Sequence, residues 1–261
     1  MNEVDDAVRS GDLDAARAAA LSAVKAAPTN HDARRRFIDV LIVAGDLEAA
    51  DRQAAILAKL SPDLAVGLAL LRGRLRAARA RVEWFMNGAV PAFPGGPTER
   101  DALAMELAVA LRDDTAAAPT LVERLDAAAE TSLAVDGTVR PFRDADGRVP
   151  HALEVLCSDG SYMWVDCARV GEVRFEPPAT LRDLAWRRAS LTLDDGSQTD
   201  VVLPATYHAP EPTDAHRLAR ETEWRETHGV VCGVGQKAFL AGDDAVYALE
   251  LQTLAAEDTA A

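Results

Sequence analysis

The stretches GDLDAARAAALSAVKAAP at residues 11–28 and GDLEAADRQAAILAKLSP at residues 45–62 begin 34 residues apart and share their turn, paired alanines and closing proline. This offset is the period of a tetratricopeptide helix pair. Glycine and aspartate fit a tight turn between helices, alanine allows close helix packing, and proline cannot continue a helix. The repeat therefore predicts helix pairs. Generic alanine-rich helix pairs are the alternative, because the large residues expected in each first helix occur only as Phe37 and Leu41 of the second unit.

Further helices are predicted up to about residue 130, because alanine and leucine recur at helical spacing. Residues 87–98, NGAVPAFPGGPT, interrupt this pattern and predict a connector in which Val90 and Phe93 are expected as apolar anchors. Thr98 and Asp101 have the spacing of a helix cap. The predicted helices are residues 32–44, 47–60, 64–85 and 102–111, followed by one that opens at Pro119 and ends near Glu130.

The sequence changes character near residue 135, where β-branched and aromatic residues replace the alanine runs. Asp195-Gly196 separates two alternating segments within residues 190–203, which predicts a β-hairpin. Thr180 and Asp183 have the spacing to cap a short helix over residues 180–186. Two more hairpins are predicted, at Asp159-Gly160 between residues 153–157 and 162–165, and at Gly242-Asp243 between residues 238–240 and 246–251.

These patterns predict an α+β protein of two domains. Residues 1–135 form a tetratricopeptide-like helical-repeat domain, and residues 136–261 form a β-rich domain with short helices. The hairpins of the second domain could build either an antiparallel sheet or a small barrel. Since about three repeats are needed for stability, the two helix pairs must be completed by later helices or by the β-rich part.

Composition limits the possible partners and compartment. The 261 residues carry a net charge of −14, so a nucleic-acid partner is not expected. No apolar run has the length of a membrane span, and the N-terminus MNEVDDAVRSGD lacks the regions of a signal peptide. Three cysteines at unrelated spacings indicate reduced thiols rather than a disulfide framework. A cytoplasmic protein that contacts neither membrane nor nucleic acid is therefore expected.

One helix is locally basic. Arg72, Arg76 and Arg79 fall at helical spacing on one face, within a cluster that also contains Arg74 and Arg81. A solvated helix face explains this pattern, and an acidic protein partner is the alternative.

The motifs that usually carry chemistry lack their structural context. Gly233-Val-Gly235-Gln-Lys-Ala238 matches a dinucleotide fingerprint, but the residues after it indicate a strand and a turn rather than a helix. His228 and Cys232 have ligand spacing only on a helix, which the intervening glycines oppose, and Cys157 and Cys167 are ten residues apart. No G-x-S-x-G nucleophile elbow occurs. We therefore expect no metal, no cofactor and no catalytic residues.

Several short sequence motifs of the β-rich part resemble those of a known family. They are LEVL at residues 153–156, GSYMWV at 160–165, PPATLRDLAW at 177–186, LP at 203–204 with Tyr207, EW at 223–224 and GVGQ at 233–236. Together with the Gly-Asp-Leu helix pairs and the turn NGAVPAF at residues 87–93, this order resembles the ImpE family, also called SciE-type or TagJ, which accompanies bacterial type VI secretion. The chain departs from the family pattern at RETEW, residues 220–224, where a glycine-bearing Gly-Arg-x-Thr-Asp-Trp-like segment is expected.

The resemblance implies a non-enzymatic accessory protein of the secretion machine that binds a helix of the small contractile-sheath subunit. It also implies a link to the ClpV-type ATPase that dismantles the sheath. Helix pairs can present a concave face to an amphipathic helix. From the repeat register and the basic helix, the expected partner-binding residues are Asp5, Arg35, Asp39, Ile42, Arg72, Arg76 and Arg79, with Gly73 if a third helix pair follows.

An enzyme is the alternative function. Its small-molecule pocket would lie in the β-rich part near Tyr207, Trp224 and Gly235. A buried ionisable group beside a concave apolar pocket would favour the enzyme, and an exposed groove with an apolar floor would favour the adaptor.

Overall fold

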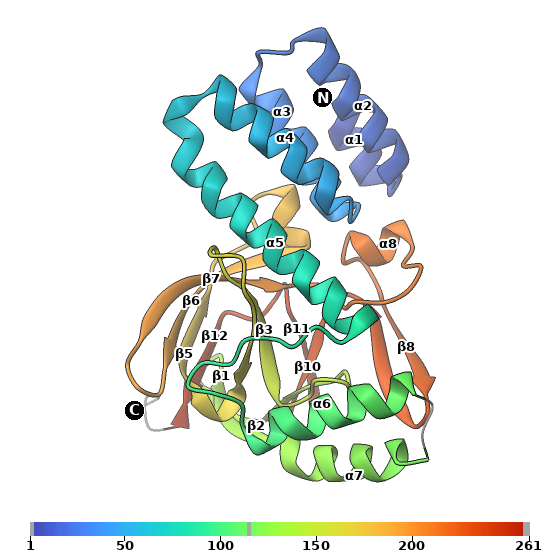
Figure 1. Cartoon of the computed structure of the whole chain (residues 1–261), viewed down its shortest axis with the longest axis vertical. Coiled ribbons are helices and arrows are strands. Elements are labelled where there is room, and N and C mark those ends of the chain that lie inside the picture. The colour runs from blue at the N-terminus through green and yellow to red at the C-terminus, as the bar shows by residue number, and fades with distance from the viewer. Residues whose placement is uncertain (1–2, 114–115, 258–261) are drawn as a thin grey trace.

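The computed structural model describes residues 3–113 and 116–257, so the outermost residues of the two expected domains, 1–2 and 258–261, lie outside the described part. Helices form the first half of the chain and a large curled sheet forms most of the second half (Figure 1). The helices are α1 (Glu3–Ser10), α2 (Leu13–Ala26), α3 (His31–Val43), α4 (Leu47–Leu60), α5 (Ala65–Asn87), α6 (Glu99–Arg112), α7 (Ala118–Ala129) and α8 (Asp214–Arg217), with short 3₁₀ turns η1 (Pro62–Leu64), η2 (Cys167–Arg169) and η3 (Leu181–Leu184). The expected α+β fold is confirmed.

The repeated Gly-Asp-Leu word builds the same turn twice. Gly11 and Gly45 have φ angles of 83° and 80°, a left-handed conformation that glycine adopts without strain. The following aspartates cap the next helices: Asp12 accepts a hydrogen bond from the backbone N–H of Ala15, and Asp46 accepts one from Ala49. The helix pairs α1–α2 and α3–α4 are thus confirmed, while their tetratricopeptide character stays a prediction.

A third helix pair does not follow among the described residues. Helix α5 continues past α4 and crosses onto the sheet, while α6 packs against α7 and β4. Gly73 lies against the backbone of Ser158 in the turn between β3 and β4, and Arg76 donates a hydrogen bond to the carbonyl oxygen of Asp159 at 3.4 Å. The β-rich part therefore occupies the place next to α5, and Gly73 and Arg76 face that part rather than an open groove.

The glycine- and proline-rich segment after α5 lies along the edge of the sheet. Ala92 forms a parallel bridge with Met163 of β4. Phe93 packs edge-on against Trp164, with ring centroids 6.0 Å apart, as its expected anchoring role requires. Val90 is 70% exposed, so its expected role as an anchor is wrong.

Twelve described strands follow: β1 (Thr131–Val135), β2 (Thr138–Asp144), β3 (Ala152–Leu156), β4 (Tyr162–Asp166), β5 (Val170–Phe175), β6 (Trp186–Leu193), β7 (Gln198–Pro204), β8 (Thr222–Thr227), β9 (Val230–Gly235), β10 (Ala238–Ala241), β11 (Asp244–Tyr247) and β12 (Thr253–Ala256). Ten of them form one antiparallel sheet in the order β11-β10-β2-β1-β12-β5-β6-β7-β3-β4, and β8 pairs with β9. The three predicted hairpins are present as β3–β4, β6–β7 and β10–β11. The second strand of the last one ends at Tyr247, so its expected extension to residue 251 is wrong.

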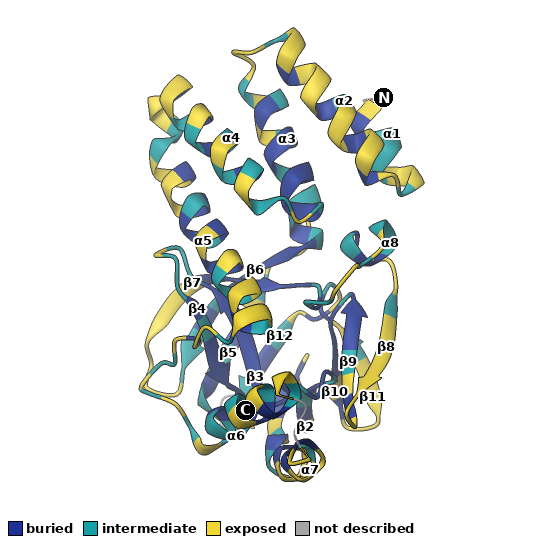
Figure 2. Ribbon diagram, turned by 45° about the vertical axis from the view of Figure 1, so that its right-hand side comes forward, coloured by how far each residue is buried: buried dark blue, intermediate teal, exposed yellow. Residues whose placement is uncertain are grey.

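Two buried hydrophobic clusters stabilise this arrangement. One lies within the curl of the sheet and includes Phe142, Val155 and Leu254. The other joins the helices to the sheet, since Ile38 and Leu75 belong to the same cluster as residues such as Trp164 of β4. Figure 2 shows α3 and the sheet as largely buried, whereas α2 and α7 expose their outer faces. None of the described helices has the length and apolar character needed to cross a membrane.

Candidate functional site

A groove with an apolar floor lies between α3, the first half of α5 and the η3 turn. Its volume is about 400 Å³. Helical periodicity places Gly67, Leu68, Leu71 and Arg74 on one face of α5, and this face lines the groove. The full set of lining residues is Arg35, Ile38, Asp39, Leu64, Gly67, Leu68, Leu71, Arg74, Thr180 and Arg182. The sequence positions Arg182 because Thr180 and Asp183 form a reciprocal capping box that fixes the η3 turn.

Three arginines and one aspartate surround the groove, and their charges are only partly paired. Arg182 lies 3.6 Å from Asp39, and Arg35 lies 3.7 Å from Asp32. Burial raises the pKa of Asp39 even though Arg182 opposes the shift. Burial and the nearby Arg182 charge lower the pKa of Arg74. The groove therefore combines an apolar floor with an excess of positive charge at its rim.

The predicted basic face of α5 points elsewhere. Arg72 donates hydrogen bonds of 2.7 and 3.2 Å to Asp51 of α4, and Arg79 lies 3.7 Å from Glu48 of the same helix. At 3.6 residues per turn, Arg72, Arg76 and Arg79 lie about 140–160° around the helix from Arg74. These arginines connect α5 to α4 and to the β3–β4 turn, outside the groove.

Two other residues expected to bind the partner lie outside the groove: one forms an ion pair between helices and one lines a second cavity. Asp5 of α1 forms an ion pair with Arg36 of α3. Ile42 is only 3% exposed and lines a separate cavity beyond the groove. Of the seven expected partner-binding residues, the structure brings Arg35 and Asp39 together in the groove. Arg74 could have been found from its spacing to Leu71 and Gly67, but nothing in the local sequence indicates that Arg182 lies beside it.

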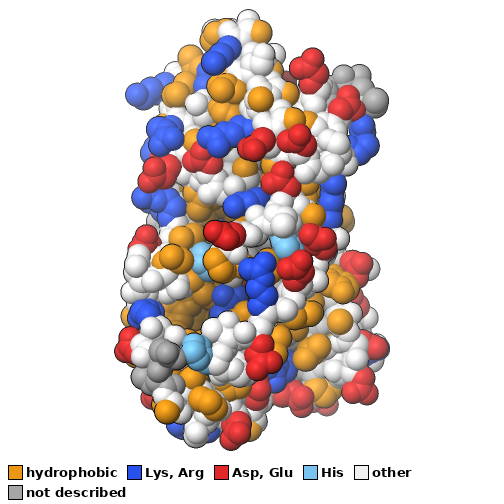
Figure 3. Space-filling view, turned by 90° about the vertical axis from the view of Figure 1, so that its right-hand side faces the viewer, with side chains coloured by type: hydrophobic (Ala, Val, Ile, Leu, Met, Phe, Trp, Pro, Cys, Tyr) orange, Lys and Arg blue, Asp and Glu red, His pale blue; other side chains and the backbone are white. Residues whose placement is uncertain are grey.

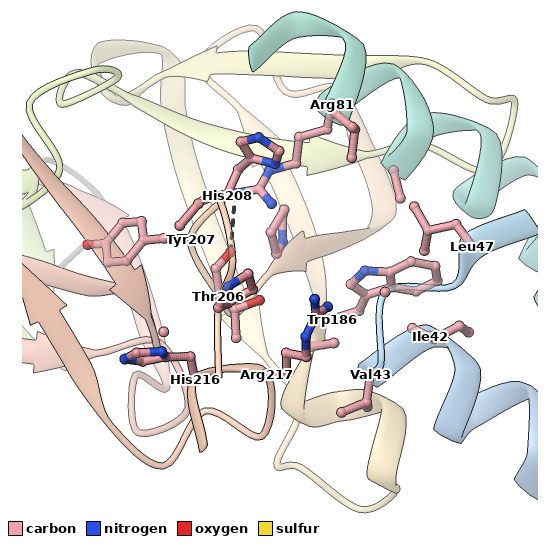
Figure 4. Close-up of a pocket in the computed structure, with 18 of the residues that line it drawn as sticks. Ile42, Val43, Leu47, Arg81, Trp186, Thr206, Tyr207, His208, His216 and Arg217 are labelled. Carbon is pink, nitrogen blue, oxygen red and sulfur yellow. Dashed lines mark hydrogen bonds between the residues drawn. The ribbon is translucent and has the colours of Figure 1, made fainter. Parts of the chain in front are cut away.

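The second cavity, of about 260 Å³, lies where the helical and β-rich parts meet. Figure 4 shows Ile42, Val43 and Leu47 on one side, Tyr207 and His216 on the other, and Trp186 between them. This is the place of the pocket expected for an enzyme, because Tyr207 and Gly235 both line the cavity. Trp224 does not line it; its indole is 46% exposed and its ring centroid lies 5.7 Å from that of Tyr207.

A buried network of charges lies beside this cavity. Arg81 donates hydrogen bonds of 2.7 and 2.9 Å to Glu154, and Lys237 forms ion pairs with both Glu154 and Asp144. Burial opposes ionisation of Glu154, but the charges of Arg81 and Lys237 hold its pKa well below the usual range. Tyr207 donates a 2.9 Å hydrogen bond to Asp144, and burial raises the tyrosine pKa well above its ordinary value.

The charges of this network are paired within the chain. Each ionised member already has an oppositely charged partner in the chain, and Tyr207 is too weak an acid to exchange a proton near neutral pH. The nearby His208 is equally unsuited as a general base, because burial and the charges of Arg81 and Arg148 lower its pKa to about 4.

Two clusters of the described residues have metal-ligand composition, and hydrogen bonding argues against metal at both. In the first, His151 lies 2.9 Å from Asp101, and Asp166 is paired with Arg100. In the second, Nε2 of His216 lies 3.5 and 3.7 Å from Glu221 and Glu223.

The hydrogen bonds of His216 explain why the second cluster is unsuited to a metal ion. Its Nδ1 accepts a hydrogen bond from the backbone N–H of Thr213, which places the imidazole proton on Nε2 in the neutral ring. A metal at Nε2 would require that proton to leave as well, so the site does not suit a cation.

The thiols and the glycine motif also have structural roles. Burial and Asp159 raise the pKa of Cys157 to about 11, and burial raises that of Cys232 to about 11, so both are poor nucleophiles at neutral pH. Gly233 lies under the ring of Tyr207, where a side chain would not fit. A strand, β10, follows Gly235 in place of the helix that dinucleotide binding needs.

Charge on the surface is mixed. On the face that includes α8 and β8, acidic and basic side chains alternate with hydrophobic ones (Figure 3). A single-sign field of the kind that binds nucleic acid is not present on the face shown.

Comparisons of sequence and of structure find relatives of this chain among known proteins. The family model described as "ImpE protein" matches residues 136–255. A Pseudomonas aeruginosa protein named "Type VI secretion system accessory component TagJ" is 31% identical over 255 residues, covering 94% of this chain and 88% of that protein. The crystal structure of protein VPA1032 from Vibrio parahaemolyticus is similar with a TM-score of 0.88 and 28% identity, covering 97% of this chain and 96% of that one. The two full-length matches span both the helical and the β-rich parts of this chain, and the chain belongs to the ImpE family.

Proposed function

We propose that this protein is a non-enzymatic accessory component of a bacterial type VI secretion system. In this role it acts in the cytoplasm, holds a helix of the small contractile-sheath subunit, and contributes to disassembly of the sheath by the ClpV-type ATPase. The family membership supports an accessory role, because the TagJ relative is named as an accessory component of that system. The groove between α3, α5 and η3 is the observation that favours helix binding.

The chemistry of the groove suits the apolar face of one amphipathic helix. Its floor is formed by Ile38, Leu68 and Leu71, which are 1, 7 and 8% exposed. Burying an aliphatic side chain of the partner contributes roughly 1.5–3 kcal/mol, so two or three anchors supply roughly 3–9 kcal/mol before the cost of association. We therefore expect a dissociation constant in the micromolar range or weaker.

Gly67 offers a clean test of the groove. It lies on the groove face of α5, and a Cβ added there would meet nothing within 4 Å. Replacing Gly67 with tryptophan should fill the groove without disturbing the fold, and Gly67→Ala is the matched control that leaves it open. Titration of purified small sheath subunit should show full affinity for Gly67→Ala and at least a tenfold loss for Gly67→Trp. Equal affinity of wild type and Gly67→Trp would show that the groove is not the binding site. Absence of binding by wild type would show that the small sheath subunit is not the partner.

A small-molecule function for the second cavity is the alternative, because buried charges lie beside it. A ligand present at a hundredfold excess over its dissociation constant stabilises the folded state by about 2.7 kcal/mol. A thermal-shift screen of nucleotides and metabolites tests this: stabilisation of that size, abolished by Ala78→Trp at the cavity wall, would support the enzyme. We favour the accessory function, since the members of the charged network are already paired with one another.

A further inference from the structure

Arg74 and Arg182 lie at one end of the groove, and neither makes a hydrogen bond to a carboxylate of the described residues. Within residues 3–113 and 116–257, no hydrogen-bond acceptor is found for Arg74, and its Nε atom is buried away from solvent. Arg182 has Asp39 at 3.6 Å, which is beyond a good hydrogen bond. The two neighbouring guanidinium groups thus have the charges of Asp39 and Asp200 nearby but a hydrogen bond to neither.

Resting on the proposed function, we infer that the partner helix carries an acidic side chain that binds between Arg74 and Arg182, and that this carboxylate selects the partner. A carboxylate can accept bidentate hydrogen bonds from a guanidinium group, and such charge-assisted bonds are among the stronger ones in proteins. Arg74 is half-buried, and the accessible part of its guanidinium group would gain an acceptor that the described residues do not supply.

Other arginines of α5 differ from Arg74 in being hydrogen-bonded to carboxylates of the chain. Arg72 and Arg81 each donate two hydrogen bonds to a carboxylate of the chain itself, Asp51 and Glu154 respectively. The chain as a whole has a net charge of −14. A basic groove on an acidic protein attracts an acidic helix to that one surface and repels it elsewhere.

The geometry also limits where the acidic residue lies in the partner. Arg74 follows Gly67 by seven residues, which corresponds to roughly 10 Å along α5. A helix that follows α5 should therefore place its acidic residue about seven positions from the apolar residue that covers Gly67, with further apolar residues between them over Leu68 and Leu71.

Arg74→Met is the decisive variant, because methionine keeps an apolar stem and removes the guanidinium group. Arg79→Met is the matched control on the opposite side of the same helix, where Arg79 has only Glu48 at 3.7 Å. Isothermal titration of the purified small sheath subunit should show an affinity loss of about 10- to 100-fold for Arg74→Met and less than about twofold for Arg79→Met. The Arg74→Met loss should persist at 0.5 M salt, because the contact is partly buried.

A double-mutant cycle then identifies the carboxylate. Each acidic residue of the bound helix is replaced by alanine, and one of these replacements should cause no further loss in the Arg74→Met background. Additive losses for every acidic residue would overturn the inference. Unchanged affinity for Arg74→Met together with a loss for Gly67→Trp would also overturn the inference. In that case the helix would still bind in the groove, but without the proposed carboxylate contact. Failure of wild type to bind the subunit would instead end the proposed function itself.

Discussion

Replacing glycine with alanine should have opposite effects at two positions of α5. Both Gly67 and Gly73 lie within this helix, where alanine is more favourable than glycine by roughly 0.5–1 kcal/mol. At Gly67 the new methyl group meets nothing within 4 Å, so the free energy of unfolding should rise by about that amount. At Gly73 the same methyl group would overlap the Ser158 carbonyl in the β3–β4 turn.

The cost at Gly73 follows from the atoms involved. The Ser158 carbonyl would have to retreat by roughly 2 Å to reach ordinary contact distance, and backbone lies on both sides of the contact. Overpacking of this kind typically costs about 1–3 kcal/mol. Taking the upper end and subtracting the helix-propensity gain gives a net loss of about 2 kcal/mol. For a chain of this size, that corresponds to a fall in melting temperature of about 4–8 °C.

Urea unfolding followed by circular dichroism at 222 nm measures both variants under the same conditions. We expect unchanged m-values and a midpoint that rises for Gly67→Ala and falls for Gly73→Ala. The close contact between α5 and the β3–β4 turn is the reason for the difference. Equal stabilisation by the two substitutions would show that the turn does not lie against the helix, and the joint packing of helices and sheet would have to be reconsidered.

Two further substitutions and two pH titrations test other parts of the structure. Gly45→Ala should lower stability by about 1–2 kcal/mol in urea unfolding, because φ is 80° and Arg217 lies against that position. Glu154→Gln should cost about 3–5 kcal/mol, since Arg81 would lose its buried counter-ion. In wild type the pKa of Glu154 is lowered by folding, so its stabilisation is present above pH about 4.5 and should be lost in acid unfolding as the pH falls further. Cys157 should react with iodoacetamide slowly at pH 8 and faster as the pH approaches 11; fast reaction at pH 8 would contradict its raised pKa.

The parts of the fold that the sequence predicts are those with local signals. The turns at Gly11 and Gly45 and the Asp-Gly hairpins depend on a few neighbouring residues with positive φ, and these residue types are recognisable. The same signal is present at Asp136-Gly137, where both φ angles are positive, and it joins β1 to β2 in a hairpin that is not among the three predicted ones. A domain boundary at residue 135 would divide this hairpin, because β1 begins at Thr131. The division of the chain into two domains therefore stays a prediction.

Long-range pairings could not be predicted in this way. Strand β12 lies between β1 and β5 although it follows them by more than half of the β-rich part, and its short sequence has no distinctive turn beside it. The residues that line the groove are equally difficult to predict from the sequence. Arg35 and Asp39 could be placed by the repeat register, but Arg182 reaches the groove only because η3 packs on α3. Which side chains meet there depends on how the sheet docks on the helices.

The β-rich part supplies what a third helix pair would supply in a longer repeat array. Near the first turn Arg220 donates a hydrogen bond to the carbonyl of Val8, and near the second Arg217 donates one to Ala44. The segment around α8 thus holds the two equivalent ends of the helix pairs. Two repeats alone rarely bury enough surface to be stable. With α8 fixing their ends and η3 lying against α3, the helix pairs are held at a defined angle to α5, and the width of the groove follows from that angle. Under the proposed function, we therefore expect substitutions at Arg217 and Arg220 to change the affinity for the partner helix through the orientation of α3, although neither residue lines the groove.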